Sequence, residues 1–471
     1  MIDRLRPALV ITAREVRDQL RDWRIIFPVL VLTVFFPFLM NFTAQQMLDF
    51  VNQYGADIIG ERLVPFLMMI VGFFPISVSL VIALETFVGE KERGSIEPLL
   101  NTPLEDWQLY LGKLLAAVVP PLLTSYLGMA VYTAGLALGR VPLPEFNVMA
   151  QILALTTVQA VMMVSGAVVV SVQSTSVRAA NLLASFIVIP VALLIQGESV
   201  LMFWGTNGAL WWAVLGISVL TLLLVRVGLA HFQREELLGR QIDVLNFRWG
   251  WRVFSQSFTG GAKNIREWYL RTIPQTIRKM RGSTLMVAGF SVAGVLIGLS
   301  QLNRFMIPLD QTALHNLEER LNMVLEIWPL FSFVPVLAIW WQNVRVMLLA
   351  MVVGLFSFGI LGMLPLIASL GVAGYLLGLL TANGLSVVSY LGFVLPHGIF
   401  EIPAVILATA AVFRLGIELA TPTQERTIGE VFLSALADWC VVMAGVVIPV
   451  LLLAAGIEAW VTPRLAIMMI K

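Results

Sequence analysis

The chain has 471 residues, of which 59% are hydrophobic and only 13% charged, and its mean hydropathy is +0.88. Soluble domains carry about a quarter charged residues, so this composition excludes an ordinary soluble protein. Thirty Lys and Arg against 29 Asp and Glu leave a formal charge of +1, which argues against a nucleic-acid partner. The single cysteine, Cys440, excludes an internal disulfide and a thiolate-only metal cage, and we interpret it as core packing in an apolar helix.

Apolar runs that could cross a bilayer recur along the whole chain, since one span needs about 20 apolar residues. The predicted spans, about twelve, are 25–43, 63–88, 110–138, 148–172, 180–196, 209–230, 284–301, 327–342, 346–363, 364–381, 386–413 and 436–457. Three of the later runs are short or tightly joined, and Pro396 with Gly398 interrupts 386–413, so one of them could be re-entrant or half-length. The expected fold class is an all-α polytopic membrane protein.

Lys and Arg concentrate ahead of the first span and in alternate loops. The basic positions on this side are Arg4, Arg6, Arg14, Arg17, Arg21, Arg24, Lys91, Arg93, Lys113 and Arg178. The opposite loops are acidic or nearly neutral and hold Asp49, Asp57, Glu61, Arg62, Arg140, Glu145 and Glu198. Because cytoplasmic loops are enriched in Lys and Arg, the pattern predicts a multi-pass protein with a cytoplasmic N-terminus.

Amphipathic and polar stretches lie outside the spans. Residues 1–24 are expected to form an interfacial helix, and 311–328 repeat its pattern on the outer side. The apolar stripe of the first helix consists of Leu5, Leu9, Val16, Leu20 and Trp23. Between 231 and 283 basic residues alternate with aromatic ones, which is typical of a linker lying on the anionic lipids of the inner leaflet. The alternative is a docking surface for a partner.

The expected domains are 1–235, a basic cytoplasmic linker at 236–283, and 284–471.

The loop between the second and third spans is the most densely charged part of the chain. It reads Gly89-Glu90-Lys91-Glu92-Arg93-Gly94-Ser95-Ile96-Glu97-Pro98-Leu99-Leu100-Asn101-Thr102-Pro103. The charged run and the short apolar face that follows it predict a short cytoplasmic helix projecting from two long spans. The alternative is a charged hairpin that only maintains topology.

This stretch, with Ala83-Leu84-Glu85 before it and Tyr110-Leu111-Gly112-Lys113-Leu114-Leu115 after it, resembles the coupling-helix region of ABC transporter type-2 permeases. The resemblance covers about 1–235 and implies a six-helix permease half whose coupling helix, within 89–108, docks on a separate ATPase subunit. The residues that it implies in ATPase coupling are Glu90, Glu92, Arg93, Gly94, Glu97, Thr102 and Pro103.

A separate ATPase is also expected because the chain has no Gly-x-x-x-x-Gly-Lys-Ser/Thr motif and no soluble region that could hold a nucleotide-binding domain. We therefore expect a transport subunit that is not itself an enzyme and binds no cofactor, with ATP and Mg on the partner. Six spans make half of a transport pathway, so a homodimer or a pair with a paralogous permease is expected.

The second half contains an ionisable pair inside an apolar run. His397 and Glu401 are four residues apart, so they share a face if 397–413 is helical, and such groups are costly in a membrane unless they are paired. One interpretation is a proton-linked or ligand-binding site, and the other is a hydrogen-bonded pair that fixes a broken helix. A metal site is disfavoured because the other two histidines, His231 and His315, lie on other loops.

Residues 280–460 resemble the stage II sporulation protein M family. The resemblance rests on Gln342-Asn343-Val344-Arg345-Val346, on Pro396-His397-Gly398 with Glu401, and on Arg414-Leu415-Gly416. We therefore include Asn343, Arg345 and Gly398 with His397 and Glu401 in a polar site of the second module. The family is associated with peptidoglycan remodelling and membrane engulfment, and the resemblance implies an architecture more than a reaction.

Three functions are compatible with these features. The first is the permease subunit of an ABC exporter in a prokaryotic plasma (inner) membrane, because short outer loops leave little room for a substrate-binding protein. The second is an ATP-driven mechanical relay that controls a cell-wall enzyme. The third is a proton-coupled carrier, which predicts two related halves that the sequence does not have.

Smaller polar and glycine positions have structural interpretations. We expect Gln159, Ser165, Ser171 and Gln173 to form hydrogen bonds between helices, the alternative being that they are substrate ligands. We expect Gly294/Gly298 and Gly374/Gly378 to serve internal helix packing, the alternative being a dimer face.

Overall fold

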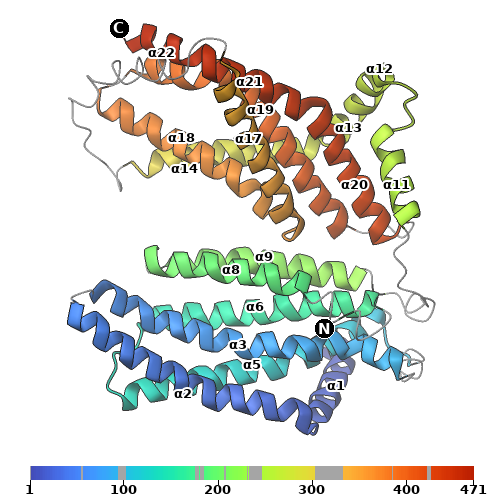
Figure 1. The fold of residues 1–471 in the computed structure, drawn as a ribbon. Coiled ribbons are helices and arrows are strands. Elements are labelled where there is room, and N and C mark those ends of the chain that lie inside the picture. The colour runs from blue at the N-terminus through green and yellow to red at the C-terminus, as the bar shows by residue number, and fades with distance from the viewer. Residues whose placement is uncertain are drawn as a thin grey trace. The chain divides into compact units, whose positions relative to one another are not determined.

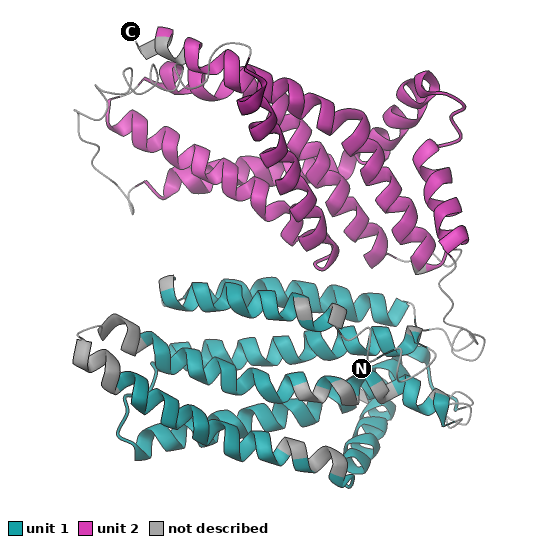
Figure 2. Ribbon diagram, viewed as in Figure 1, with its two compact units in different colours: residues 1–245 teal, residues 246–471 magenta. Residues whose placement is uncertain are grey.

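The structure, a computed structural model, describes residues 2–54, 57–93, 102–174, 180, 185–205, 208–230, 232, 247–302, 332–384, 386–421 and 426–470. Every element in these ranges is helical, and nine of the helices are long and apolar enough to cross a membrane. The predicted fold class, an all-α polytopic membrane protein, is therefore confirmed. The chain divides into two compact units, residues 1–245 and 246–471, which are coloured separately in Figure 2.

Unit 1 consists of one short helix followed by longer ones. These are α1 (Ile2–Gln19), α2 (Trp23–Tyr54), α3 (Asp57–Glu92), α5 (Asp106–Leu138), α6 (Phe146–Gln173), α8 (Ser185–Trp204) and α9 (Ala209–Ala230). The six long helices overlap the six spans predicted for this part of the chain. Within the unit α3 packs against α5 and α6, and α6 packs against α9.

Helix α1 confirms the predicted N-terminal helix, and it packs on α5 while running across the direction of the longer helices (Figure 1). Ala8 is fully buried in this contact, whereas Leu9 and Leu20 are each 54% exposed. The exposed apolar side chains are ones that we expected to face lipid.

The charge pattern placed Glu198 in an outer loop, and this prediction is wrong. It belongs to helix α8, which extends to Trp204, and it is 2% exposed. Gln159 of α6 donates its Nε2 hydrogens to both carboxylate oxygens of Glu198, at 2.8 and 2.6 Å. This pairing is the physical reason that an acidic residue can lie inside the helix, since a buried carboxylate must find donors.

Unit 2 is built around one long central helix, α19. Its elements are α11 (Phe247–Thr259), α12 (Ile265–Glu267), η1 (Trp268–Thr272), α13 (Ile273–Lys279), α14 (Arg281–Ser300), α17 (Phe333–Leu355), η2 (Leu361–Met363), α18 (Leu364–Ala382), α19 (Val387–Ala420), α20 (Ile428–Val442), η3 (Met443–Val447), α21 (Ile448–Trp460) and α22 (Thr462–Ile470). Helix α19 packs against α14, α17, α20, α21 and α22. Its residues Ala408, Ala411 and Leu415 join Met347 and Trp439 in the main buried core.

Two expectations about the spans of unit 2 are wrong. The predicted spans 327–342 and 346–363 are not separate, because α17 runs without a break from Phe333 to Leu355. The polar residues that divide the hydropathy profile have partners: Asn343 donates to Glu401, and Arg345 donates to Gln342. Helix α19 likewise continues through Pro396 and is not interrupted there. Neighbouring helices support a proline in a membrane helix, so the missing N–H does not end it.

The described part of the predicted linker, residues 247–283, packs on unit 2 itself. Helix α11 and helix α13 both lie against α20, and the turn between α11 and α12 uses Gly260 and Gly261 at φ values of 58° and 77°. Trp268 Nε1 donates to the carbonyl oxygen of Phe258 at 2.8 Å, which joins the two arms of the hairpin. Trp251 remains 70% exposed. Contact of this hairpin with lipid stays a prediction, and the predicted outer helix 311–328 lies outside the described residues.

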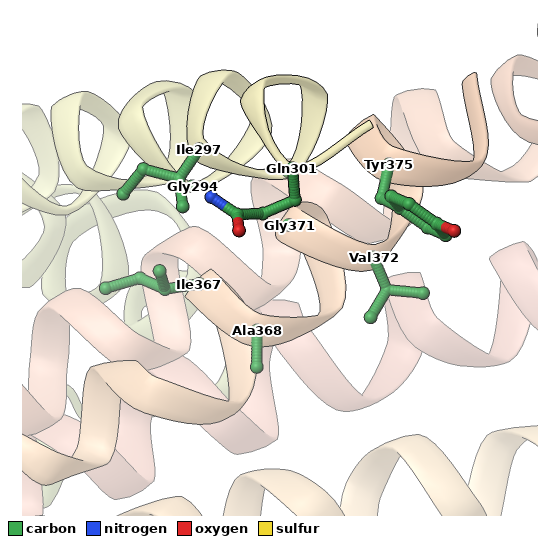
Figure 3. Close-up of a pocket in the computed structure, with 9 residues that line it drawn as sticks. Gly294, Ile297, Gln301, Ile367, Ala368, Gly371, Val372 and Tyr375 are labelled. Carbon is green, nitrogen blue, oxygen red and sulfur yellow. The ribbon is translucent and has the colours of Figure 1, made fainter. Parts of the chain in front are cut away.

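Glycines bring α14 and α18 together, as the sequence predicted. A Cβ on Gly294 would lie 2.9 Å from the carbonyl oxygen of Ile367, and one on Gly298 would clash with the backbone of Gly371. Beside this contact is a pocket of about 510 Å³, whose lining also includes Gln301 and Tyr375 (Figure 3). Internal packing of Gly294 and Gly298 is therefore confirmed, because no side chain fits between these two backbones.

The Arg414-Leu415-Gly416 motif also has a packing role. The turn between α17 and η2 places Phe358 and Gly359 at positive φ, 50° and 83°. A Cβ on Gly416 would clash with the carbonyl of Phe358, so the turn can lie directly on α19 only because this position is glycine. Arg414 Nε donates to Glu418 Oε1 at 2.7 Å on the same helix.

Candidate functional site

The described coupling residues lie at the end of α3 and just before α5. Glu92 is the last residue of α3, and the N–H of Arg93 donates to the carbonyl of Gly89 at 3.1 Å, which extends the helical turn. Glu92, Arg93 and Pro103 are exposed, and Thr102 is partly buried. Gly94, Glu97 and the predicted short helix lie outside the described residues.

Glu90 points into the protein, toward a buried lysine. Lys113 Nζ of α5 lies 2.8 Å from Glu90 Oε1 of α3 and 3.5 Å from Glu15 Oε1 of α1. The Lys113 side chain is 0% exposed, and its Nζ lies 5.2 Å from the ring centroid of Phe87. We call Lys113, Glu90 and Glu15 the lysine junction. It joins three helices at the end of α3 that leads into the coupling segment.

The same end of α5 is joined to α1 by hydrogen bonds from side chains to backbone carbonyls. Thr12 Oγ1 donates to the carbonyl oxygen of Gly112 at 3.0 Å, and Gln108 Nε2 donates to that of Arg4 at 2.8 Å. A Cβ on Gly112 would lie 2.9 Å from the carbonyl oxygen of Ala8. The absence of a side chain at Gly112 therefore lets the two helices approach, next to the lysine junction.

Helix α3 is tied to α6 at this level as well. The hydroxyl oxygen of Ser171 accepts from the N–H groups of Phe87 and Val88, each at 3.1 Å. Phe232 follows α9, and its ring centroid lies 5.2 Å from that of Phe87 and 5.8 Å from that of Tyr110. A displacement of the segment after α3 would thus reach α1, α5 and α6 through direct polar contacts.

A second polar cluster lies in unit 2. One ring nitrogen of His397 and one carboxylate oxygen each of Glu401 and Glu458 lie within 4.8 Å of one another, and all three side chains are partly buried. Asn343 Nδ2 donates to Glu401 Oε1 at 3.1 Å. His397 Nδ1 lies 3.2 Å from the hydroxyl oxygen of Thr462. We call His397, Glu401 and Glu458 the histidine–glutamate cluster.

The structure brings together some of the predicted polar-site residues and separates others. Asn343 and Glu401 are bonded, and His397 is beside Glu401, as their spacing on α19 predicted. Arg345 is exposed and pairs with Gln342 instead. Gly398 is buried, but a Cβ there would make only ordinary contacts, the nearest 3.5 Å from Ile402. Close packing therefore does not explain a glycine at this position.

Sequence reasoning missed Glu458 and Thr462 in this cluster. Glu458 lies one residue beyond the predicted span 436–457, where an acid is easily taken for the start of a loop. The available signal was that a single acid at the end of an otherwise apolar run can turn back into the bundle.

Sequence reasoning also counted Lys113 among the loop charges, although it is buried within α5. The expected interhelical hydrogen bonds are confirmed for Gln159 and Ser171, whereas Ser165 bonds to Val161 of its own helix. The side chain of Gln173 lies outside the described residues.

Two family models match the chain. Residues 9–207 match the model described as ABC-2 family transporter protein, and residues 283–463 match the model described as Stage II sporulation protein M. Neither the search of curated proteins nor the search of solved structures found a match. The two matched ranges correspond to the two resemblances that the motifs indicated, and they lie in different units.

Proposed function

We propose that the chain, which matches the ABC-2 family transporter model over residues 9–207 and the Stage II sporulation protein M model over 283–463, is the membrane (permease) subunit of an ABC exporter. It has no Walker-type nucleotide motif, so ATP and Mg²⁺ would bind to a partner ATPase. That ATPase would dock on residues 89–108. Six long helices form half of a pathway, so two such units, identical or paralogous, would assemble around it.

The observation that carries this proposal is the lysine junction. Lys113 binds Glu90 at 2.8 Å and Glu15 at 3.5 Å at the point where the chain leaves α3 for the coupling segment. The contact is charge-assisted and the Lys113 side chain is 0% exposed. It is therefore stiff, because moving α1 or α3 away from α5 would separate a carboxylate from a buried ammonium. The junction can therefore convert a push on the coupling segment into a concerted movement of α1, α3 and α5.

Exposed charges supply the docking surface in this proposal. Glu92 and Arg93 are exposed where α3 ends, so they can meet charged groups of an ATPase. Glu90 has the different task of holding Lys113. The outward direction of transport is supported by the short predicted outer loops of unit 1, which offer little surface for a substrate-binding protein.

A double substitution tests the docking surface. The chain carrying Glu92→Gln and Arg93→Gln is co-expressed with the ABC ATPase encoded nearest to its gene, purified in detergent and reconstituted into lipid vesicles. We expect the ATPase to co-purify with the unaltered chain and to be lost from the variant. Retention of the ATPase with unaltered ATP turnover would contradict the docking role.

A matched control comes from the opposite end of α5. Arg140 and Glu145 are also exposed and also of opposite charge, but they belong to the turn between α5 and α6. Replacing both with Gln should leave ATPase association and turnover unchanged. A loss in both double variants would indicate general instability rather than a docking surface.

The Stage II sporulation protein M match favours a second candidate, a mechanical relay. In this alternative the ATPase moves unit 1, unit 2 passes the movement on, and a cell-wall enzyme responds. Reconstituted vesicles separate the two functions, since an exporter must move a labelled lipid or solute when ATP is hydrolysed. ATP turnover without any transport, together with ATP-dependent capture of a peptidoglycan hydrolase, would favour the relay.

A further inference from the structure

The histidine–glutamate cluster has the composition and spacing of metal ligands. His397 and Glu401 lie one turn apart on α19, and α21, which packs against α19, supplies Glu458. The three ligand atoms lie within 4.8 Å of one another. Zinc binds nitrogen and oxygen ligands at about 2 Å, so ligand atoms about 3–4 Å apart are required, and small side-chain rotations provide this.

The charges of the cluster also call for a cation. Two carboxylates lie together in helices that are long and apolar enough to span a membrane, and within the described ranges no Lys or Arg forms an ion pair with Glu401 or Glu458. Other partly buried acids of unit 2 do have such partners: Lys279 lies 3.8 Å from Asp438, and Arg414 binds Glu418. Buried carboxylates without a basic partner are expensive, and a divalent cation would neutralise both at once.

Hydrogen bonds around the cluster orient its ligands. The hydroxyl of Thr462 donates to the carbonyl of Ile457 at 3.3 Å, so its oxygen can accept from His397 Nδ1–H at 3.2 Å. That arrangement leaves the lone pair of His397 Nε2 available for a metal. Asn343 binds one oxygen of Glu401 and leaves the other available. Metal-binding histidines and carboxylates are held in this way by a second layer of partners.

We propose that unit 2 binds one divalent transition metal ion of the zinc class through His397, Glu401 and Glu458. One imidazole and two carboxylates suit zinc and its neighbours better than calcium, which prefers six or more oxygen ligands. Three protein ligands leave a coordination position for water. This site departs from the expectation that the chain binds no metal, which rested on the number of histidines and did not include Glu458.

Metal content and affinity of the full chain test the proposal. The protein is purified in detergent without chelators and its metals are measured by mass spectrometry. It is then stripped with EDTA and titrated with Zn²⁺ against a chromogenic chelator. We expect one Zn²⁺ per chain, and an affinity at least about 100-fold lower for His397→Gln or Glu458→Gln. Co²⁺ should give visible absorption bands of a low-symmetry site that disappear in the same variants.

Thr462→Val keeps the test decisive if the ligand variants fold poorly. This change nearly preserves side-chain shape and removes the hydroxyl that accepts from His397 Nδ1–H, together with its hydrogen bond to the carbonyl of Ile457. An affinity about 10- to 100-fold lower is expected, together with an unchanged gel-filtration profile. Glu198→Gln, in unit 1, is the matched control. Glu198 is also a buried carboxylate in an apolar helix, and its partner is the amide of Gln159 in the same unit. The control variant should bind Zn²⁺ as the unaltered chain does.

Two outcomes would overturn the metal site. Zn²⁺ below about one tenth of an equivalent after titration would mean that the cluster holds protons instead of a metal. Equal affinity in the unaltered chain, Glu458→Gln and Thr462→Val would mean that Zn²⁺ binds elsewhere. Neither result would bear on the proposed transport function, which depends on unit 1.

Discussion

The lysine junction of unit 1 and the histidine–glutamate cluster of unit 2 both place two carboxylates beside a nitrogen base, but they differ in charge balance. In the junction one ammonium, Lys113, lies between two carboxylates that are each about one quarter exposed. The cluster has two carboxylates beside an imidazole, and no basic partner for them among the described residues. One site therefore contains its own counter-charge, and the other is built to receive one.

This difference separates a mechanical role from a binding role. A pair that is satisfied within the chain gains nothing from a ligand, but it couples the helices that carry it. A cluster with unbalanced acids is less stable by itself, and it gains free energy when a cation binds. Substitutions that alter the charge balance should consequently have opposite effects at the two sites.

Removal of the buried cation should produce the largest effect. Lys113→Met removes the buried ammonium from between Glu15 and Glu90, and breaking a buried ion pair in this way costs about 3–5 kcal/mol. We expect the free energy of unfolding, measured by SDS titration in detergent, to fall by this amount. Adding Glu15→Gln and Glu90→Gln to Lys113→Met should recover much of the loss. An unchanged unfolding curve for Lys113→Met would show that the junction does not hold the helices.

Replacing a glutamate with glutamine should change the free energy of unfolding in opposite directions at the two sites. Glu90→Gln removes a charge-assisted hydrogen bond and should lower the free energy of unfolding by about 1.5–3 kcal/mol. In EDTA-treated protein, Glu458→Gln relieves the clustered acids and should raise it by about 1 kcal/mol. Zn²⁺ at 100 times its Kd should then stabilise the unaltered chain by about 2.7 kcal/mol and Glu458→Gln very little. Destabilisation by both substitutions would remove the distinction between the two sites.

The helices, the exposed end of α3 and the His397–Glu401 spacing could be predicted because each depends on residues close in sequence. The remaining features depend on contacts between distant helices. Hydropathy divides α17 at Asn343, but the helix continues because Glu401 of another helix accepts a hydrogen bond from that side chain. The role of Lys113 likewise depends on Glu15, which lies in α1. No local pattern contains such pairs, so charge counting placed Lys113 and Glu198 in loops.

The Gln159–Glu198 pair is an intermediate case, a buried acid that is satisfied by an amide and not by a cation. Interhelical hydrogen bonds in membranes contribute about 0.6 kcal/mol on average and at most about 1.7 kcal/mol. A double-mutant cycle of Gln159→Leu and Glu198→Leu should therefore give a coupling energy in this range, well below the loss expected for Lys113→Met. Ser165→Ala is the control, because Ser165 bonds within its own helix at 2.6 Å and should show no coupling to Glu198→Leu. A coupling energy for Gln159 and Glu198 as large as the loss in Lys113→Met would imply that an amide donor suffices for a buried membrane acid, and the argument that Glu401 and Glu458 need a cation would then fail.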